Sequence, residues 1–173
     1  MYDQKEEQRE KQEHFVEYLA YGSNLLSERI KIGNPSAKEP RLGILKGFRL
    51  AFQGYSSRWN GGTANIVPED NSVVLGVVWK IKAEDIAHLD AQEFGYRPIT
   101  VNVRVDDKIV QCRTYVQIVS GESTKPSLAY KTIMLKGAIE HNMEVDYIES
   151  LRQISDNGVN KCALQSLTPI IST

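Results

Sequence analysis

The chain has 173 residues, of which 41% are hydrophobic and 25% charged, and its formal net charge is −1 at pH 7. This length favours one domain with one hydrophobic core, and the composition is that of a globular protein. A net charge this close to zero provides no large basic field, so we expect neither nucleic acid nor a membrane surface as a partner.

We expect the two ends of the chain to be less ordered than its middle. Residues 1–14 are almost all polar or charged, so they cannot bury enough apolar surface to offset the entropy of ordering. We predict a disordered or fraying helical arm there, a single domain over residues 15–160, and a loose tail over residues 161–173.

The sequence also bears on where the protein works. Its first residues lack the apolar stretch of a signal peptide, and its longest apolar run, residues 73–79, is too short to cross a bilayer. Cys112 and Cys162 do not have the number or spacing of a disulfide framework. We therefore expect a cytoplasmic protein.

Apolar runs predict six strands. The first strand stops at a Gly-Ser-Asn turn, and the run over residues 73–81 is almost entirely apolar, which is typical of a central strand covered on both faces. Residues 68–71 are a cluster of turn-forming types, so we expect the chain to turn there. The expected strands cover residues 15–21, 42–52, 63–67, 73–81, 99–105 and 110–118.

Helical patterns occur over residues 25–31, over residues 82–93 and after Pro126. Pro126 suits the first turn of a helix, and Leu128, Leu135 and Ile139 then fall on one helical stripe. The strands cluster in the middle of the chain without a regular alternation with helices. This arrangement favours an α+β fold with a mixed, strongly curved or closed sheet.

The turn after the first strand is a candidate binding site. Gly22 permits backbone conformations that other residues avoid, and Ser23 and Asn24 are both good helix caps. A strand that turns into a helix in this way gathers main-chain N–H groups, which bind carboxylates and developing oxyanions. The alternative is an ordinary capped turn without a ligand.

Glu93 ends the helix predicted after the central strand. Ile86, Leu89 and Glu93 are spaced by three and four residues, so they share one apolar face. Loss of water on that face and the nearby helix C-terminus both raise the pKa of a carboxyl, plausibly toward ~6–7, where a general acid–base works best. The alternative is a structural glutamate, either solvated or paired with Arg97 or Arg113.

Other chemically active side chains give weaker signals. His14, His88 and His141 lack the spacing of metal ligands, and we expect no metal and no other cofactor. Cys112 alternates with apolar residues that face the core, so a buried structural role is favoured over that of a nucleophile. Tyr130 stands near the start of a helix, where it could direct its hydroxyl into a cleft or simply pack.

Several short motifs, taken in order, resemble those of the γ-glutamylcyclotransferase family. The resemblance covers about residues 15–151. It includes Tyr-x-Ala-Tyr-Gly-Ser-Asn from Tyr18 to Asn24 and Leu-Asp-x-Gln-Glu, which ends at Glu93. The other motifs are Asn34-Pro35-Ser36-Ala37, Trp59-Asn60-Gly61-Gly62, Leu75-Gly76-Val77-Val78-Trp79 and Tyr130-Lys131.

This resemblance implies a mixed β-barrel flanked by helices, with the substrate cavity at its mouth. It implies the conversion of γ-glutamyl amino acids to 5-oxoproline and a free amino acid, by attack of the α-amine on the γ-carbonyl, in glutathione and γ-glutamyl metabolism. The partner would be this small substrate, and a homodimer is expected because the family includes homodimers. Glu93 matches the catalytic residue, and the substrate-binding residues are implied to be Tyr18, Leu19, Ala20, Tyr21, Gly22, Ser23 and Tyr130.

The residues after Glu93 depart from the family pattern. The family usually has a glycine next and then a longer loop to a tyrosine, whereas this chain has Phe94, a short loop, and Tyr96 as the candidate for that tyrosine. Two alternatives stay open beside the γ-glutamyl amino acid activity. One is a cyclotransferase directed to γ-glutamylamines or to glutathione, and the other is a non-catalytic small-molecule-binding module with the same fold.

Overall fold

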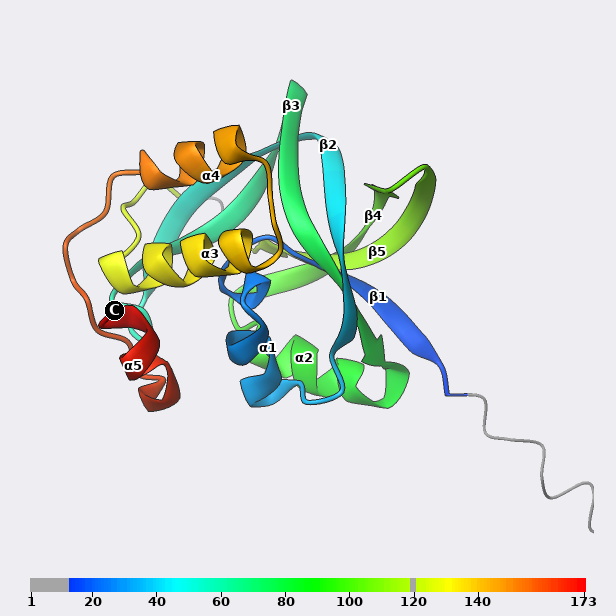
Figure 1. The fold of residues 1–173 in the computed structure, drawn as a ribbon, viewed down its shortest axis with the longest axis horizontal. Helices are drawn as coiled ribbons and strands as arrows, with labels where there is room; N and C mark the ends of the chain where they lie inside the picture. Colours follow the sequence, from blue (N-terminus) through cyan, green and yellow to red (C-terminus); the bar gives the residue numbers. More distant parts are fainter. Residues whose placement is uncertain (1–12, 119–120) are drawn as a thin grey trace, which may run out of the picture.

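Five strands close into a barrel. The computed structural model describes residues 13–118 and 121–173, so most of the predicted N-terminal arm lies outside the described residues. The strand order is β1–β3–β2–β4–β5, with helices outside the barrel (Figure 1), which confirms the α+β closed barrel. The strands are β1 (Phe15–Ala20), β2 (Lys38–Ser56), β3 (Gly61–Lys82), β4 (Tyr96–Val105) and β5 (Lys108–Gln117).

β2 and β3 form a long antiparallel ribbon, and the chain reversal predicted at residues 68–71 is wrong. Phe48 pairs with Pro68 and Lys46 pairs with Val73, so four residues of β3 lie opposite Gly47 alone. A bulge accepts a proline, which has no N–H to donate to a ladder, and residues with unusual backbone angles. The turn-forming residues therefore widen one continuous strand instead of separating two.

The hairpin of β4 and β5 confirms the two alternating strands expected from the sequence. Val105 pairs with Lys108 across a two-residue turn in which Asp106 has a φ of 52°. Val103 and Cys112 are buried on the inner face. The opposite end of this hairpin, at Tyr96, reaches the mouth of the barrel where the candidate site lies.

Helices cover the outside of the barrel. Figure 1 shows α3 and α4 side by side along one side, while α1 and α2 lie near each other beyond one end. Among the helices of residues 13–118 and 121–173, none has the length and apolarity that crossing a membrane requires. The helices are α1 (Ser27–Gly33), α2 (Ile86–Gln92), α3 (Leu128–Glu140), α4 (Val145–Arg152) and α5 (Thr168–Ile171), with 3₁₀ turns η1 (Ser23–Leu25), η2 (Ala83–Asp85) and η3 (Gln165–Leu167).

α3 presents a different face to the core from the one its largest apolar residues predict. Tyr130, Ile133 and Met134 are buried, whereas Ile139 is 48% exposed. Gly137 explains the choice, because a Cβ atom there would lie 2.6 Å from the Cβ of Leu25. The face that carries Gly137 is thus the one that approaches η1, and the large residues on that face are buried with it.

The segment over residues 161–173, expected as a loose tail, is ordered and packed. Leu167 and Ile171 are 1% and 6% exposed, in a segment that forms η3 and α5. Lys136 of α3 donates to the Ile170 carbonyl at 2.7 Å. Two apolar residues four positions apart are too short a pattern to predict a helix, and their burial against α3 provides the order that local sequence does not.

Candidate active site

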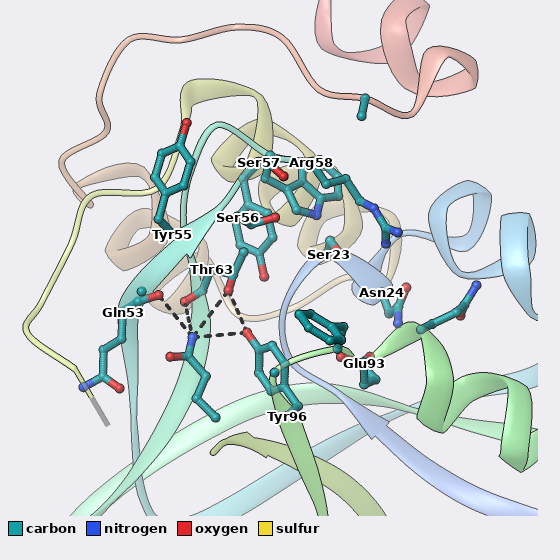
Figure 2. Close-up of a pocket in the computed structure, with 18 of the residues that line it drawn as sticks. Ser23, Asn24, Gln53, Tyr55, Ser56, Ser57, Arg58, Thr63, Glu93 and Tyr96 are labelled. Atoms are coloured by element: carbon teal, nitrogen blue, oxygen red, sulfur yellow. Dashed lines mark hydrogen bonds between the residues drawn. The ribbon is translucent and has the colours of Figure 1, made fainter. Parts of the chain in front are cut away.

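Two adjacent cavities lie at the mouth of the barrel. An outer cavity of about 600 Å³ and an inner recess of about 50 Å³ are both lined by Ser23, Asn24, Glu93, Tyr96 and Tyr130. These residues come from η1, the end of α2, the start of β4 and the first turn of α3, so four separate elements meet here (Figure 2). The fold therefore brings together the two motifs that the sequence singles out.

The turn between β1 and η1 depends on glycine because of a close approach. A Cβ atom on Gly22 would lie 2.6 Å from the hydroxyl oxygen of Tyr130 and 3.3 Å from the Cβ of Ala64. The next residues are held by Trp79, whose Nε1 donates to the carbonyl oxygen of Asn24 at 3.1 Å. A side chain at position 22 would push the turn away from α3 and open the recess.

The Tyr130 hydroxyl is built into the main chain around it. Its oxygen accepts from the N–H of Ala64 at 3.1 Å. Burial raises the pKa of Tyr130 far above its usual value, so the hydroxyl keeps its proton. The Tyr130 hydroxyl thus accepts from the main chain while it lines the inner recess.

Glu93 lies at the C-terminal end of α2, where its N–H donates to the carbonyl of Leu89 at 3.1 Å. The Tyr18 hydroxyl is 3.5 Å from its Oε1, and Asn24 Nδ2 donates to that hydroxyl at 3.1 Å. Burial raises the pKa of Glu93 to about 7, while the Arg29 guanidinium and the Tyr18 hydroxyl oppose part of the rise. This carboxyl can therefore take and give a proton near neutral pH.

Arg113, one of the two arginines considered as a partner of Glu93, is paired elsewhere. Its Nη2 donates to both carboxyl oxygens of Asp90, each at 2.8 Å, and Tyr115 also donates to Asp90. Arg97, the other arginine considered, is exposed. Arg113 is paired with Asp90 of α2. The ion pair between Arg113 and Glu93 that would keep Glu93 ionised is therefore not formed.

Tyrosines line the inner recess. The rings of Tyr18 and Tyr115 meet edge to face with centroids 5.9 Å apart, and the Tyr21 hydroxyl donates to the carbonyl of Tyr115. Tyr96, the candidate for the tyrosine after the short loop, reaches the same recess and donates to the carbonyl of Ala64 at 2.6 Å. The walls are thus stiff aromatic rings whose hydroxyls provide the polar contacts.

The outer cavity is wider and carries positive charge. Arg29 and Arg58 both line it, and the guanidinium of Arg29 lies 5.8 Å from the ring centroid of Trp59. Two aromatic residues stand on its rim: Phe94 is 95% exposed and Tyr55 is 73% exposed. Phe94, the departure from the family pattern, therefore lies at the entrance and not in the inner recess.

Most of the residues predicted for the site lie together. Glu93 is joined in the inner recess by Tyr18, Tyr21, Gly22, Ser23 and Tyr130. Leu19 and Ala20 are not among the described lining residues of either cavity, so the role predicted for these two stays a prediction. Their side chains are 0% and 1% exposed. Successive side chains of a strand point to opposite faces, and both faces of β1 are covered, so both side chains are buried.

Sequence reasoning missed several residues of the site. Asn24 belongs to the Gly-Ser-Asn motif and could have been included on that ground. Arg29, Arg58 and Tyr115 carry no signal of their own, because each stands in an ordinary helix, turn or strand pattern. Their positions depend on contacts between elements far apart in the chain.

The fold and the site define a class of small barrel proteins with one buried carboxyl at the mouth of the barrel. The profile of the AIG2-like family matches residues 73–151, the stretch from the second half of β3 to α4. A solved structure of a γ-glutamyl cyclotransferase superposes with a TM-score of 0.87 and 35% identity, and the match covers 92% of this chain and 99% of that chain.

Curated relatives narrow the class to one family. The γ-glutamylcyclotransferase of Bos taurus is 38% identical over 163 residues, which cover 89% of this chain and 86% of that protein. The γ-glutamylcyclotransferase of Homo sapiens is 37% identical over 164 residues, with the same coverage. The chain belongs to the γ-glutamylcyclotransferase family.

Proposed function

We propose that the protein cyclises γ-glutamyl amino acids and releases 5-oxoproline and the free amino acid. The observation that carries this proposal is the Glu93 carboxyl, whose pKa is raised to about 7 in a recess that also holds the Gly22 turn and the Tyr130 hydroxyl. The names of the relatives at 37% and 38% identity support the same reaction.

In the proposed complex, the glutamyl end of the substrate occupies the inner recess and the leaving amino acid occupies the outer cavity. Glu93 lines both spaces, so its carboxyl lies where the γ-amide between the two halves would cross from one to the other. The Tyr18 hydroxyl and the amide of Asn24 form a chain that orients this carboxyl. The Glu93 carboxyl can then exchange protons first with the α-nitrogen of the substrate and later with the leaving nitrogen.

The reaction moves two protons in turn from the α-nitrogen to the leaving nitrogen. Glu93 takes a proton from the α-ammonium of the substrate, and the neutral amine attacks the γ-carbonyl carbon. A C–N bond forms within a five-membered ring, which is favoured because both reacting groups belong to one molecule. Glu93 then gives the proton to the leaving nitrogen as the original C–N bond breaks, which restores the carboxylate. The carboxylate takes the second proton from the ring nitrogen, which leaves the neutral lactam, and passes it to the released amine.

Negative charge develops on the γ-carbonyl oxygen during the attack. We assign its stabilisation to the O–H of Tyr130, because the oxygen of this hydroxyl already accepts from the N–H of Ala64 and burial keeps its proton in place to donate. A hydrogen bond accepted by the oxygen polarises the O–H bond and strengthens its donation. A donor fixed in place before the reaction is the most effective kind of oxyanion stabiliser.

Release of 5-oxoproline tests the proposal directly. We expect release from γ-glutamylalanine, and we expect Glu93→Gln to lower kcat by about 10²–10⁴-fold. Glu84→Gln is the matched control, because Glu84 is an exposed carboxylate on the neighbouring η2 and should retain the wild-type rate.

The same assay separates the alternatives. Faster release from glutathione or from γ-glutamyl-lysine would favour a glutathione-directed or γ-glutamylamine-directed cyclotransferase. Calorimetric binding of γ-glutamylalanine without any 5-oxoproline would favour a non-catalytic binding module and would contradict the proposed reaction.

We also propose a cytoplasmic location and a homodimer. Cys112 and Cys162 are both free thiols, which suits a reducing compartment. The homodimer is suggested by the family resemblance, and sedimentation velocity would test it. A single species of monomer mass at micromolar concentration would contradict the dimer without bearing on the reaction.

A further inference from the structure

Arg29 is a buried cation in the wall of the outer cavity. It is 6% exposed, and its Nε has no hydrogen-bond partner among the described residues. A buried guanidinium with an unsatisfied N–H donor is unfavourable, and the charge of Arg29 also acts on Glu93 nearby. The face of Trp59 lies 5.8 Å from the guanidinium but cannot satisfy its N–H donors. Such a group is matched by an anion that arrives with the ligand.

Arg58 brings a second guanidinium to the same cavity. It lies in the turn between β2 and β3, labelled on the cavity wall in Figure 2, and its carbonyl oxygen accepts from the N–H of Ala163 at 2.8 Å. Burial lowers the pKa of Arg29, and the positive charge of Arg58 lowers it further. The packed C-terminal segment thus fixes the backbone that carries this cation at the entrance.

The charges of the outer cavity are out of balance. Glu93 is the one carboxylate among its described lining residues, against the two guanidiniums of Arg29 and Arg58. Glu93 is also needed by the ammonium of the substrate and is half protonated at a pH of about 7. The two guanidiniums can therefore bind one further carboxylate, on the side of the scissile amide that carries the leaving amino acid.

We propose that Arg29 and Arg58 bind the α-carboxylate of the leaving amino acid, and so select γ-glutamyl amino acids over γ-glutamyl amines that lack this group. The proposal rests on the cyclisation proposed above and adds the residues that read the leaving group. The carboxylate of an α-amino acid is two bonds from the departing nitrogen, which keeps it within the outer cavity when the γ-amide lies at Glu93. Guanidinium groups suit it because they bind carboxylates through two parallel hydrogen bonds.

Two substrates that differ only in this carboxylate test the proposal. γ-Glutamylethylamide is γ-glutamylalanine without its leaving-group carboxylate. We expect the wild-type kcat/KM to be about 10–100-fold higher for γ-glutamylalanine, the range given by hydrogen bonds to a charged group. The ratio of the two values is the readout, because an altered pKa of Glu93 changes both rates alike and cancels.

Variants at the two arginines should reduce that ratio. In Arg58→Gln, which changes an exposed side chain, we expect a fall of several-fold, and in Arg29→Gln a fall to within about threefold of unity. Arg29→Lys keeps the charge without the planar fork and should lie between wild type and Arg29→Gln. Arg152→Gln, on the exposed surface of α4, is the matched control and should leave the ratio unchanged.

Each outcome decides the proposal. If wild type processes both substrates with equal kcat/KM, or if Arg58→Gln and a folded Arg29 variant keep the wild-type ratio, the carboxylate is not read by these arginines and the inference is wrong. Should Arg29→Gln fail to fold by circular dichroism, Arg29→Lys and Arg58→Gln still decide. If wild type releases 5-oxoproline from neither substrate, the proposed function itself has failed.

Discussion

At Glu93, burial and nearby charge act on one carboxyl in opposite directions. Burial raises its pKa, and the positive charge of Arg29 and the hydroxyl of Tyr18 lower it, with about 7 as the result. Neither effect alone would suit the reaction. An unopposed rise would keep the carboxyl protonated at neutral pH, and a full ion pair would keep it ionised.

This raised pKa implies that Glu93 destabilises the folded protein at neutral pH. Between about 4.5 and about 7 the folded state holds a proton on Glu93 that the unfolded state releases, so the free energy of unfolding falls as the pH rises. We expect Glu93→Gln to raise the free energy of unfolding at pH 8 by about 1–3 kcal/mol, and by almost nothing at pH 4. Urea denaturation of both proteins at the two pH values measures this.

A control variant and the pH dependence of stability together test whether burial of Glu93 causes this effect. The exposed Glu84→Gln should show no such pH-dependent gain. A Glu93→Gln protein that is less stable than wild type at pH 8, or equally more stable at both pH values, would show that the carboxyl is not held in its protonated form by burial.

Among the elements, α3 and η1 form the contact that shapes the inner recess. Gly137 of α3 lies against Leu25 and Leu26, where a Cβ atom would be 2.6 Å from the Cβ of Leu25 and from the main-chain N of Leu26. The first turn of the same helix carries Tyr130, which touches Gly22 at the other side of the turn. The spacing between α3 and this turn is therefore fixed at two points.

Gly137→Ala should move these elements apart. We expect a loss of about 1–3 kcal/mol in the free energy of unfolding from overpacking, although alanine is the better helix former. The displaced turn should also raise KM for γ-glutamylalanine. Gly121→Ala is the control, because an added Cβ there meets nothing within 4 Å. A Gly137→Ala protein with unchanged stability and KM would contradict this role for the α3–η1 contact.

Element by element, prediction from sequence succeeded where one local pattern decides the structure. The spacing of Ile86, Leu89 and Glu93 alone predicts that the carboxyl lies on the apolar side of α2. Pro68 and its neighbours also have the composition of a local turn. Their structure depends instead on pairing with β2, against which they form a bulge. Arg29 has no signal, because its burial arises from packing of α1 against the turn that carries Trp59.

At the scale of the whole molecule, the C-terminal segment closes the side of the site. Ala163 donates to the carbonyl of Arg58 at 2.8 Å, and Asn60 donates to the carbonyl of Lys161 at 2.9 Å. Both contacts hold the turn between β2 and β3, while Leu167 and Ile171 anchor the segment in the core. A tail that is distant in sequence thus positions one wall of the outer cavity.

Leu167→Ala tests this anchoring. Because Leu167 is 1% exposed, we expect a loss of about 2–5 kcal/mol in the free energy of unfolding, together with a higher KM for γ-glutamylalanine. Ser166→Ala changes an exposed neighbour and should alter neither quantity. A Leu167→Ala protein with wild-type stability would support the loose tail expected from sequence.

The pH dependence of kcat/KM for γ-glutamylalanine tests most directly whether Glu93 is the base. Because the base must be ionised, we predict that kcat/KM rises with pH on its acid side with an apparent pKa of about 7. In Glu93→Gln the residual rate should lose this rise. An acid limb near the ordinary glutamate value of about 4.3, or a limb that persists in Glu93→Gln, would contradict the account.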